Sequence, residues 1–133
     1  MISPEIVVQC HADHPIPGSD ALSLNAAVEW WPERTEEGFR HIMNQGPAVG
    51  AWRGSTLIGF ARAITDGHWH AYIDDVMVHP DWRRHDIATR LVARLYEVLQ
   101  VPVVTLFCAA ELVPLYEGVG FTPTNQVVLH KPK

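Results

Sequence analysis

The chain has 133 residues, and 47% of them are hydrophobic. This length suits one domain built around one core, so we expect residues 1–133 to form a single domain. The formal net charge of −5 gives no overall electrostatic support for nucleic-acid binding, and it would suit a cationic or amine-bearing partner.

No targeting or membrane-spanning segment is visible in the sequence. The N-terminus lacks a basic region followed by a long apolar run, and no apolar stretch approaches roughly 18 residues. The two cysteines, Cys10 and Cys108, lie far apart and lack the spacing of metal ligands. We therefore expect a cytoplasmic protein with reduced cysteines and no membrane partner.

The first third of the chain predicts a strand and two short helices. Residues 5–10, EIVVQC, predict the strand, and a loop rich in proline follows. Ser19 or Asp20 could cap a helix that runs to about Trp30. A second short helix, EEGFRHIMN, follows Thr35 and carries acidic residues in its first turn.

The middle of the chain predicts an antiparallel meander of three strands. The dipeptide Asp66-Gly67 is the strongest hairpin signal in the sequence, because its residues readily adopt the positive φ values of a tight turn. A second turn is expected at Arg53-Gly54. The three strands are expected at residues 47–52, 56–65 and 68–78.

A long amphipathic helix is expected after this meander. The helix opens near Arg84 and ends before Pro102. Its apolar residues recur with helical spacing and define one face that should pack on the sheet, at positions 87, 91, 95, 98 and 99.

The last third of the chain predicts a strand, a short helix and a final strand. The β-branched run VVTLF at 103–107 is typical of a strand buried on both faces. Strand, helix and strand over 68–107 are long enough for a parallel crossover. A short helix then tolerates Pro114 only near its first turn, and residues 126–132 predict the last strand.

A basic turn precedes the long helix. The stretch HPDWRRHDIATRL, residues 79–91, holds three arginines and two histidines in an otherwise acidic protein. A helix start already carries bare N–H groups and partial positive charge, so extra cations there suit a bound anion such as a phosphate. The alternative is a solvated basic turn that pairs with surface acids.

The sequence VHPDWRRHDIATRL resembles the acetyl-CoA motif of the GNAT N-acetyltransferase superfamily, with Arg83, Asp86 and Ala88 at its three key positions. The stretch LYEGVGF, residues 115–121, resembles the second hallmark of that family, a helix with a tyrosine followed by Gly-Phe. The resemblance implies an α/β (α+β mixed) fold with a central, mostly antiparallel sheet of six to seven strands and about four helices. Residues 59–80 are similar to small bacterial members and to plant serotonin N-acetyltransferases.

The resemblance also implies acetyl-CoA as a co-substrate. N–H groups of a bulged strand would bind its acetyl carbonyl and pantetheine arm, and the basic turn would bind its diphosphate. Asp86 replaces the usual first glycine and Ala109 replaces a common asparagine, so we expect a folded turn with weakened co-substrate affinity. The implied co-substrate residues are Val76, Met77, Val78, Arg83, Arg84, His85, Asp86, Ile87, Ala88 and Thr89.

Acetyl transfer to an amine needs a base for the amine and an acid for the leaving thiolate. Asp74 is the first candidate base and Asp75 the second. In a regular strand Tyr72, Asp74 and Val76 share a face, whereas Asp75 points the other way unless a bulge begins early. Either aspartate could instead cap a loop or pair with an arginine. The family motif makes Tyr116 the candidate acid, because a phenol with a pKa of about 10 is protonated at neutral pH; the alternative is a packed aromatic.

The acceptor is expected to be a small-molecule primary amine, which aromatic side chains could contact. In the resembled fold the first two helices line the acceptor pocket, so Trp30 and Trp31 are candidate substrate-binding residues, together with Tyr72 beside Asp74. The alternative is that one or both tryptophans belong to the core. Dimers are frequent in the family, so a homodimer also stays open.

Three functions remain in competition. The leading interpretation is an N-acetyltransferase in which the amine attacks the thioester directly within a ternary complex. The rival is a non-catalytic acyl-CoA-binding or regulatory module, which Asp86 and Ala109 favour. The third is a metal-binding protein that uses His68 and His70, although no third ligand is evident and the leading interpretation needs no metal.

Overall fold

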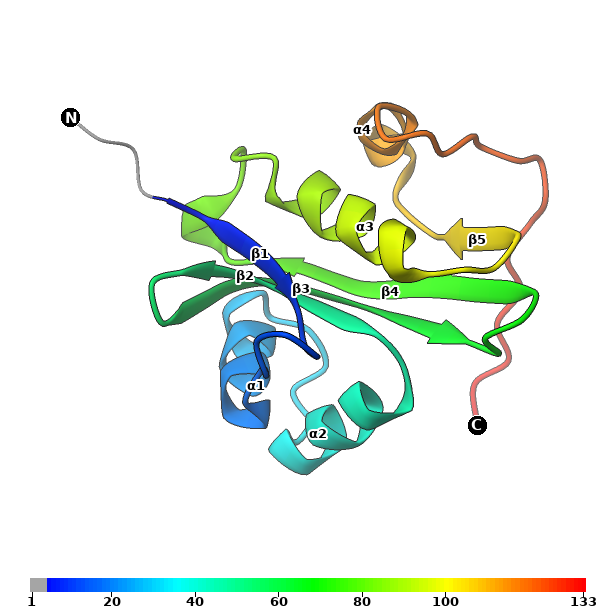
Figure 1. Ribbon diagram of the computed structural model, residues 1–133. Coiled ribbons are helices and arrows are strands. Elements are labelled where there is room, and N and C mark those ends of the chain that lie inside the picture. The colour runs from blue at the N-terminus through cyan, green and yellow to red at the C-terminus, as the bar shows by residue number, and fades with distance from the viewer. Residues whose placement is uncertain (1–4) are drawn as a thin grey trace.

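The computed structural model describes residues 5–133, which form one mixed sheet covered by helices on both faces (Figure 1). The strands lie in chain order across the sheet, the first four antiparallel to their neighbours and the fifth parallel to the fourth. This confirms the expected mixed, mostly antiparallel α+β fold. The strands are β1 (Val7–Cys10), β2 (Ala48–Arg53), β3 (Thr56–Thr65), β4 (His70–Val78) and β5 (Val103–Leu106).

The described residues form five strands rather than six or seven, because the expected strand at 126–132 is absent. That segment is exposed throughout, with Val127 at 80% and Leu129 at 89% exposure. None of its backbone groups bonds to another backbone group within residues 5–133. A β-branched run becomes a strand only where a partner backbone lies at pairing distance, and here none does.

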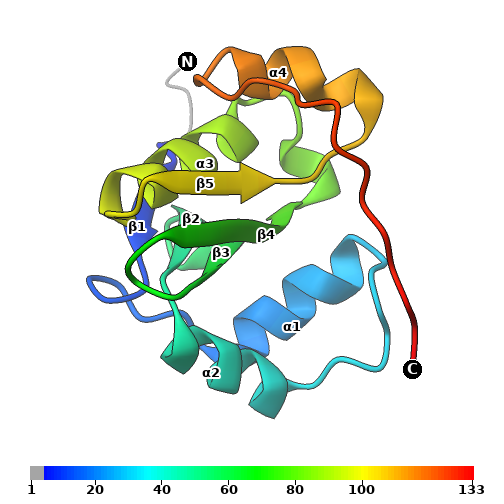
Figure 2. The same cartoon turned by 90° about the vertical axis from the view of Figure 1, so that its right-hand side faces the viewer.

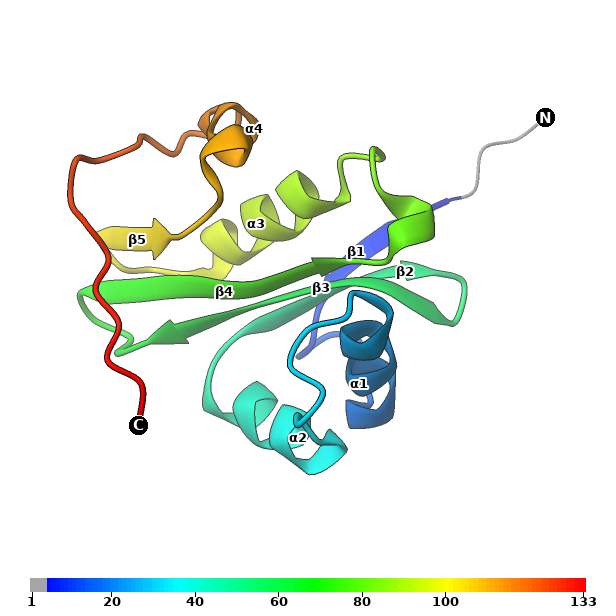
Figure 3. The same ribbon diagram turned by 180° about the vertical axis from the view of Figure 1, so that it is seen from behind.

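Two helices cover one face of the sheet, a third packs on the other face, and a short fourth helix lies on that same side beyond β5 (Figures 1 and 3). The second helix begins as expected, because the Thr35 side-chain oxygen accepts a hydrogen bond from the Gly38 N–H at 3.0 Å. The expected cap at Ser19 or Asp20 is wrong, since both residues lie inside the first helix, which starts at Gly18 after Pro17 and has no side-chain cap. Within residues 5–133, no helix has the length and apolarity needed to span a membrane. The helices are α1 (Gly18–Ala27), α2 (Glu36–Gln45), α3 (Ile87–Val98) and α4 (Val113–Glu117).

Each face of the sheet has its own hydrophobic core. On the α3 face, Ile87, Leu91 and Leu95 pack with side chains of β2, β3 and β4. The predicted face of α3 is therefore correct except at its end, where Val98 is 40% exposed. On the other face, α1 and α2 pack around the edge-to-face pair of Phe39 and Phe60, whose ring centroids lie 6.0 Å apart.

The start of α3 lies directly on the sheet at Gly59. A Cβ at this position would come within 2.8 Å of the Ile87 side chain and 3.0 Å of the Ala51 Cβ, so only glycine allows this close approach. The helix begins at Ile87 rather than near Arg84 as expected, because Arg84 and Asp86 adopt left-handed backbone conformations. The basic residues therefore belong to a turn that the sheet holds in place.

Strands β4 and β5 pair over four residues and then separate (Figure 2). The parallel ladder runs from His70–Val103 to Ile73–Leu106, which confirms the expected crossover through α3. From residue 74 to the end of β4, the edge of β4 that faces β5 pairs with no described strand. This open edge leaves backbone groups free for a ligand.

A β-bulge interrupts β4 just where the two strands separate. Arg62 pairs with Asp74, but Phe60 pairs with Met77, so β4 has one residue more than β3 across this interval. Asp75 adopts a left-handed conformation with φ of 54°. The extra residue reverses which face of the sheet the following side chains occupy.

Candidate functional site

The turn before α3 presents a row of free backbone donors. Arg84 has φ of 68° and Asp86 has φ of 57°, so both lie in the left-handed region that aspartate tolerates better than most residues. No backbone N–H from Arg83 to Thr89 donates to an acceptor within residues 5–133. Consecutive free donors at a helix start, with two arginines beside them, form a site for an anion.

This turn opens into a cavity of about 400 Å³ that also reaches β4 and α4. Of the ten residues predicted to bind the co-substrate, eight line it, and the exceptions are Met77 and His85. Met77 is fully buried in the core on the α1 and α2 face, and exposed His85 lies beside the Trp82 ring with centroids 5.5 Å apart. The structure therefore unites the basic turn with the open edge of β4.

The bulge turns Asp75 onto the same side as Asp74. Val76 and Val78 pack toward the α3 core, whereas Met77 lies in the core beneath α1 and α2, so the expectation that Val76 shares a face with Asp74 is wrong. Asp75 is only 4% exposed. One carboxylate oxygen accepts a hydrogen bond from Arg62 at 2.7 Å, and the other forms an ion pair with the Arg34 guanidinium at 3.0 Å. The carboxylate is thus fully engaged as an ion pair with two guanidinium groups.

Asp74 is more accessible than Asp75. One of its oxygens accepts a hydrogen bond from the Tyr72 hydroxyl at 3.2 Å, and the other accepts from Arg62 at 3.3 Å. Burial and the neighbouring Asp74 carboxylate raise the pKa of Tyr72 to about 12, so the phenol stays protonated and donates to Asp74. The structure therefore brings Tyr72 and Asp74 together as expected.

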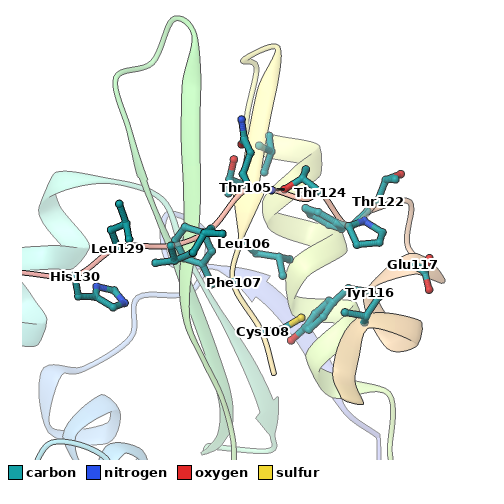
Figure 4. A pocket seen from close by; sticks show the side chains of 17 residues that line it. Thr105, Leu106, Phe107, Cys108, Tyr116, Glu117, Thr122, Thr124, Leu129 and His130 are labelled. Carbon is teal, nitrogen blue, oxygen red and sulfur yellow. Dashed lines mark hydrogen bonds between the residues drawn. The ribbon is translucent and has the colours of Figure 1, made fainter. Parts of the chain in front are cut away.

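Tyr116 lies at the boundary between two cavities. It is 7% exposed, lines the cavity beside the basic turn, and also lines a second cavity of about 600 Å³ along the outer edge of β5 (Figure 4). Burial raises the pKa of its phenol, with a smaller contribution from the nearby Cys108 thiol. A protonated phenol in this place can donate to a group in either cavity.

Trp30 and Trp31, in the loop that follows α1, have different surroundings. Trp30 lines the cavity beside the basic turn, whereas Trp31 is 53% exposed with the Arg34 guanidinium 4.5 Å from its ring centroid. The buried Asn25 side chain donates to the backbone carbonyls of both, at 2.6 and 3.3 Å. The loop is thereby fixed to α1, and only Trp30 of the two lines the cavity.

Sequence reasoning missed the two arginines that hold Asp75. Arg62 lies on β3, and its register opposite Asp74 depends on both the length of the β3–β4 loop and the bulge. That loop is longer than a two-residue turn, because the Asp66 carboxylate accepts from the N–H groups of His68, Trp69 and His70. Neither feature could be deduced from the spacing of residues.

The histidines proposed for metal binding are not on one strand face. His68 lies in the β3–β4 loop and only His70 begins β4. Among residues 5–133, no three His, Cys, Asp or Glu side chains come together in a way that could hold a metal ion. The metal-binding interpretation therefore has no support in the described part of the chain.

A sequence model of the acetyltransferase (GNAT) family matches residues 16–121. The chain is 37% identical over 68 residues to an uncharacterized N-acetyltransferase, ycf52, from the red alga Gracilaria tenuistipitata var. liui, a match covering 49% of this chain and 37% of the relative. It is 34% identical over 68 residues to the chloroplastic GCN5-related N-acetyltransferase 2 of Arabidopsis thaliana, covering 49% and 26%. The matched segment thus covers well under half of the length of either relative.

Solved structures share the fold over nearly the whole chain. A candidate acetyltransferase from Deinococcus radiodurans R1 superposes with a TM-score of 0.75 and 29% identity, covering 95% of this chain and 88% of that one. The aminoglycoside N-acetyltransferase AAC(6')-Iy, solved in complex with CoA, superposes with a TM-score of 0.69 and 15% identity, covering 99% and 97%. At that identity the second likeness shows the fold alone.

Proposed function

The chain belongs to the GNAT acetyltransferase family, and on that premise we propose that it transfers an acetyl group from acetyl-CoA to a primary amine by direct attack within a ternary complex. The observation that carries this proposal is the cavity beside the basic turn. It combines free N–H groups at the start of α3, two arginines and the open edge of β4. Such a site fits a diphosphate at one end and an extended thioester arm at the other.

The residues fit the donor in two parts. The backbone from Arg83 to Thr89 would bind the diphosphate, and the open edge of β4 at Val76 and Val78 would pair with the pantetheine amides. A bound donor supplies the activated acetyl group. The chain's own contribution is to hold that group at a fixed position, which supplies much of the rate in a reaction between two bound substrates.

Two side chains would move the protons. Asp74, directly or through a water, takes a proton from the amine as the new C–N bond forms. Tyr116, held protonated by burial, gives a proton to the sulfur as the C–S bond breaks. Asp75 is the weaker candidate base, because each of its oxygens is already paired with an arginine.

The chemical class of the acceptor follows from the family resemblance rather than from the geometry. Residues 59–80 resemble plant serotonin N-acetyltransferases, so aromatic ethylamines belong first in an acceptor panel, with Trp30 and Tyr72 as the nearest candidate rings. A cytoplasmic location and a homodimer stay predictions.

The test is thiol release from acetyl-CoA across a panel of amines, combined with calorimetry of acetyl-CoA binding. We expect turnover with at least one amine, and a loss of roughly 10²–10³-fold in kcat for Tyr116→Phe. Asp74→Asn should also lower kcat, whereas a variant that turns over normally at saturating amine would remove Asp74 as the base. Binding of acetyl-CoA without turnover on any amine would instead favour a non-catalytic acyl-CoA-binding module.

A further inference from the structure

The loop between α1 and α2, residues 28–35, forms part of the wall of the cavity beside the basic turn, which we term the donor cavity. Val28 and Trp30 line this cavity from the loop, and Val76 and Val78 line it from β4. Figure 2 shows α1 ending on the side of the sheet where β4 and β5 separate. The width of the donor cavity at this place therefore depends on how the loop is held relative to β4.

The backbone of this loop is strained. Glu29 has φ of 61° and Trp31 has φ of 23°, so both depart from the negative φ values that residues with a Cβ normally adopt. Such conformations persist only where the surrounding contacts hold them. The loop therefore needs partners outside itself to keep Trp30 at the donor cavity.

The buried Asn25 side chain provides the first of these partners. Its amide nitrogen donates to the carbonyls of Trp30 and Trp31, which fixes the start of the loop to α1. Its amide oxygen accepts a hydrogen bond from the Arg34 guanidinium at 3.4 Å. The contacts at the start of the loop are thereby linked to an arginine at its other end.

Arg34 joins the loop to β4. Its guanidinium forms an ion pair with the Asp75 carboxylate at 3.0 Å and lies over the Trp31 ring, 4.5 Å from the centroid. Asp75 is the left-handed residue of the β4 bulge and directly precedes Val76, which lines the donor cavity. Arg34 therefore contacts both α1 and the bulge, and it belongs to the loop that carries Trp30.

The two arginines that pair with Asp75 differ in how deeply they lie. The Arg62 side chain is 15% exposed and donates to Asp75 at 2.7 Å, whereas the Arg34 side chain is 26% exposed. A third cavity of about 240 Å³ borders all three side chains. Replacing Arg34 would leave the buried carboxylate paired with Arg62, so the change should release the loop without unfolding the sheet.

We infer that Arg34 is a positioning residue for the donor, because its ion pair with Asp75 holds the loop against the β4 bulge and keeps Trp30 in the wall of the donor cavity. Arg34 does not line that cavity itself, so it acts through Trp30. The inference rests on one part of the proposed function, namely that coenzyme A binds in the donor cavity.

The test is a double-mutant cycle, read by calorimetry of coenzyme A binding to the full chain. Arg34→Gln and Trp30→Ala should each weaken binding by roughly threefold to tenfold, and the double variant should bind no more weakly than the weaker single variant. Melting temperatures confirm that each variant is folded. The matched control is Arg40→Gln, which removes an exposed α2 arginine paired with Glu36 at 3.4 Å and should bind coenzyme A as the wild type does.

Hydrogen exchange gives a second readout that needs no ligand. Exchange in residues 28–34 should be faster in Arg34→Gln than in the wild type and unchanged in Arg40→Gln, because only the first change releases the loop. Unchanged exchange in the loop would overturn the inference, as would losses of coenzyme A affinity that add in the double variant.

The outcomes also separate this inference from the proposed catalysis. If the cycle is non-additive but no amine releases thiol from acetyl-CoA, Arg34 keeps its positioning role and the proposed catalysis fails. If the losses add in a protein that acetylates an amine, the proposed function stands and the role of Arg34 does not. A wild type that binds no coenzyme A would overturn both.

Discussion

The two cavities that meet at Tyr116 are built in opposite ways. The cavity beside the basic turn draws half of its lining residues from one short stretch, residues 82–89, and this stretch presents free backbone N–H groups. The second cavity is assembled from β5, α4 and the C-terminal segment, and it depends on side chains. A site made of local backbone leaves a motif in the sequence, whereas one made of distant side chains does not.

This difference explains why departures from the family motif need not destroy the donor site. Asp86 keeps the left-handed conformation that the usual glycine would have, because its backbone can adopt it. Under the proposed function, the cost is a carboxylate near the diphosphate of the donor. Substitutions should therefore affect the cavity beside the basic turn through backbone shape and charge, and the second cavity through side-chain volume.

The largest effect is expected at Asp75, where the β4 bulge borders the donor cavity. Asp75→Ala should lower the free energy of unfolding by about 3–5 kcal/mol, because it leaves Arg34 and Arg62 without their buried partner. Chemical denaturation measures the loss, and acetyl-CoA affinity of the folded fraction should fall with it. The matched variant Asp74→Asn should cost about 1 kcal/mol or less, since this carboxylate is partly exposed. Equal losses at the two positions would show that the bulge does not depend on the arginine pair.

An intermediate effect is expected at Asp86, which lines the cavity beside the basic turn and not the second cavity. Asp86→Gly removes a negative charge and a Cβ from the turn while keeping its left-handed backbone, so acetyl-CoA should bind on the order of tenfold more tightly. Calorimetry of acetyl-CoA binding to the variant and to the wild type provides the comparison. Unchanged or weaker acetyl-CoA binding would count against a diphosphate at this turn.

The smallest effect is expected in the β3–β4 loop, which lies outside both cavities. Hydrogen bonds from His68, Trp69 and His70 lower the pKa of Asp66 from 3.8 to about 2. A lowered pKa means that the charged form stabilises the fold above pH 4, and this contribution disappears as the pH falls through about 2. The melting temperature of Asp66→Asn should therefore lie below that of the wild type at pH 6 and approach it near pH 2. A difference that persists at pH 2 would mean that charge is not the cause.

Local rules predicted much of the fold. The β-branched and alternating runs gave the first five strands, Thr35 marked the start of α2, and the spacing of Ile87, Leu91 and Leu95 gave the buried face of α3. These features depend on neighbours within a few residues, where backbone preference and hydrophobic periodicity act directly. The prediction of a last strand at 126–132 was wrong, because a strand there would need a neighbouring strand to pair with, and local sequence does not supply one.

The sequence by itself determined the order of the elements up to α4, the parallel crossover and the buried face of α3, because each follows from backbone preferences and apolar spacing over short distances. Only the tertiary structure decided that Asp75 lies buried between two arginines, that Trp30 and Trp31 have different surroundings, and that Tyr116 lines two cavities of which the one beside the basic turn carries the arginines. These outcomes depend on strand register, on one extra residue in β4 and on where β5 leaves β4. All three are settled by the packing of segments that are far apart along the chain.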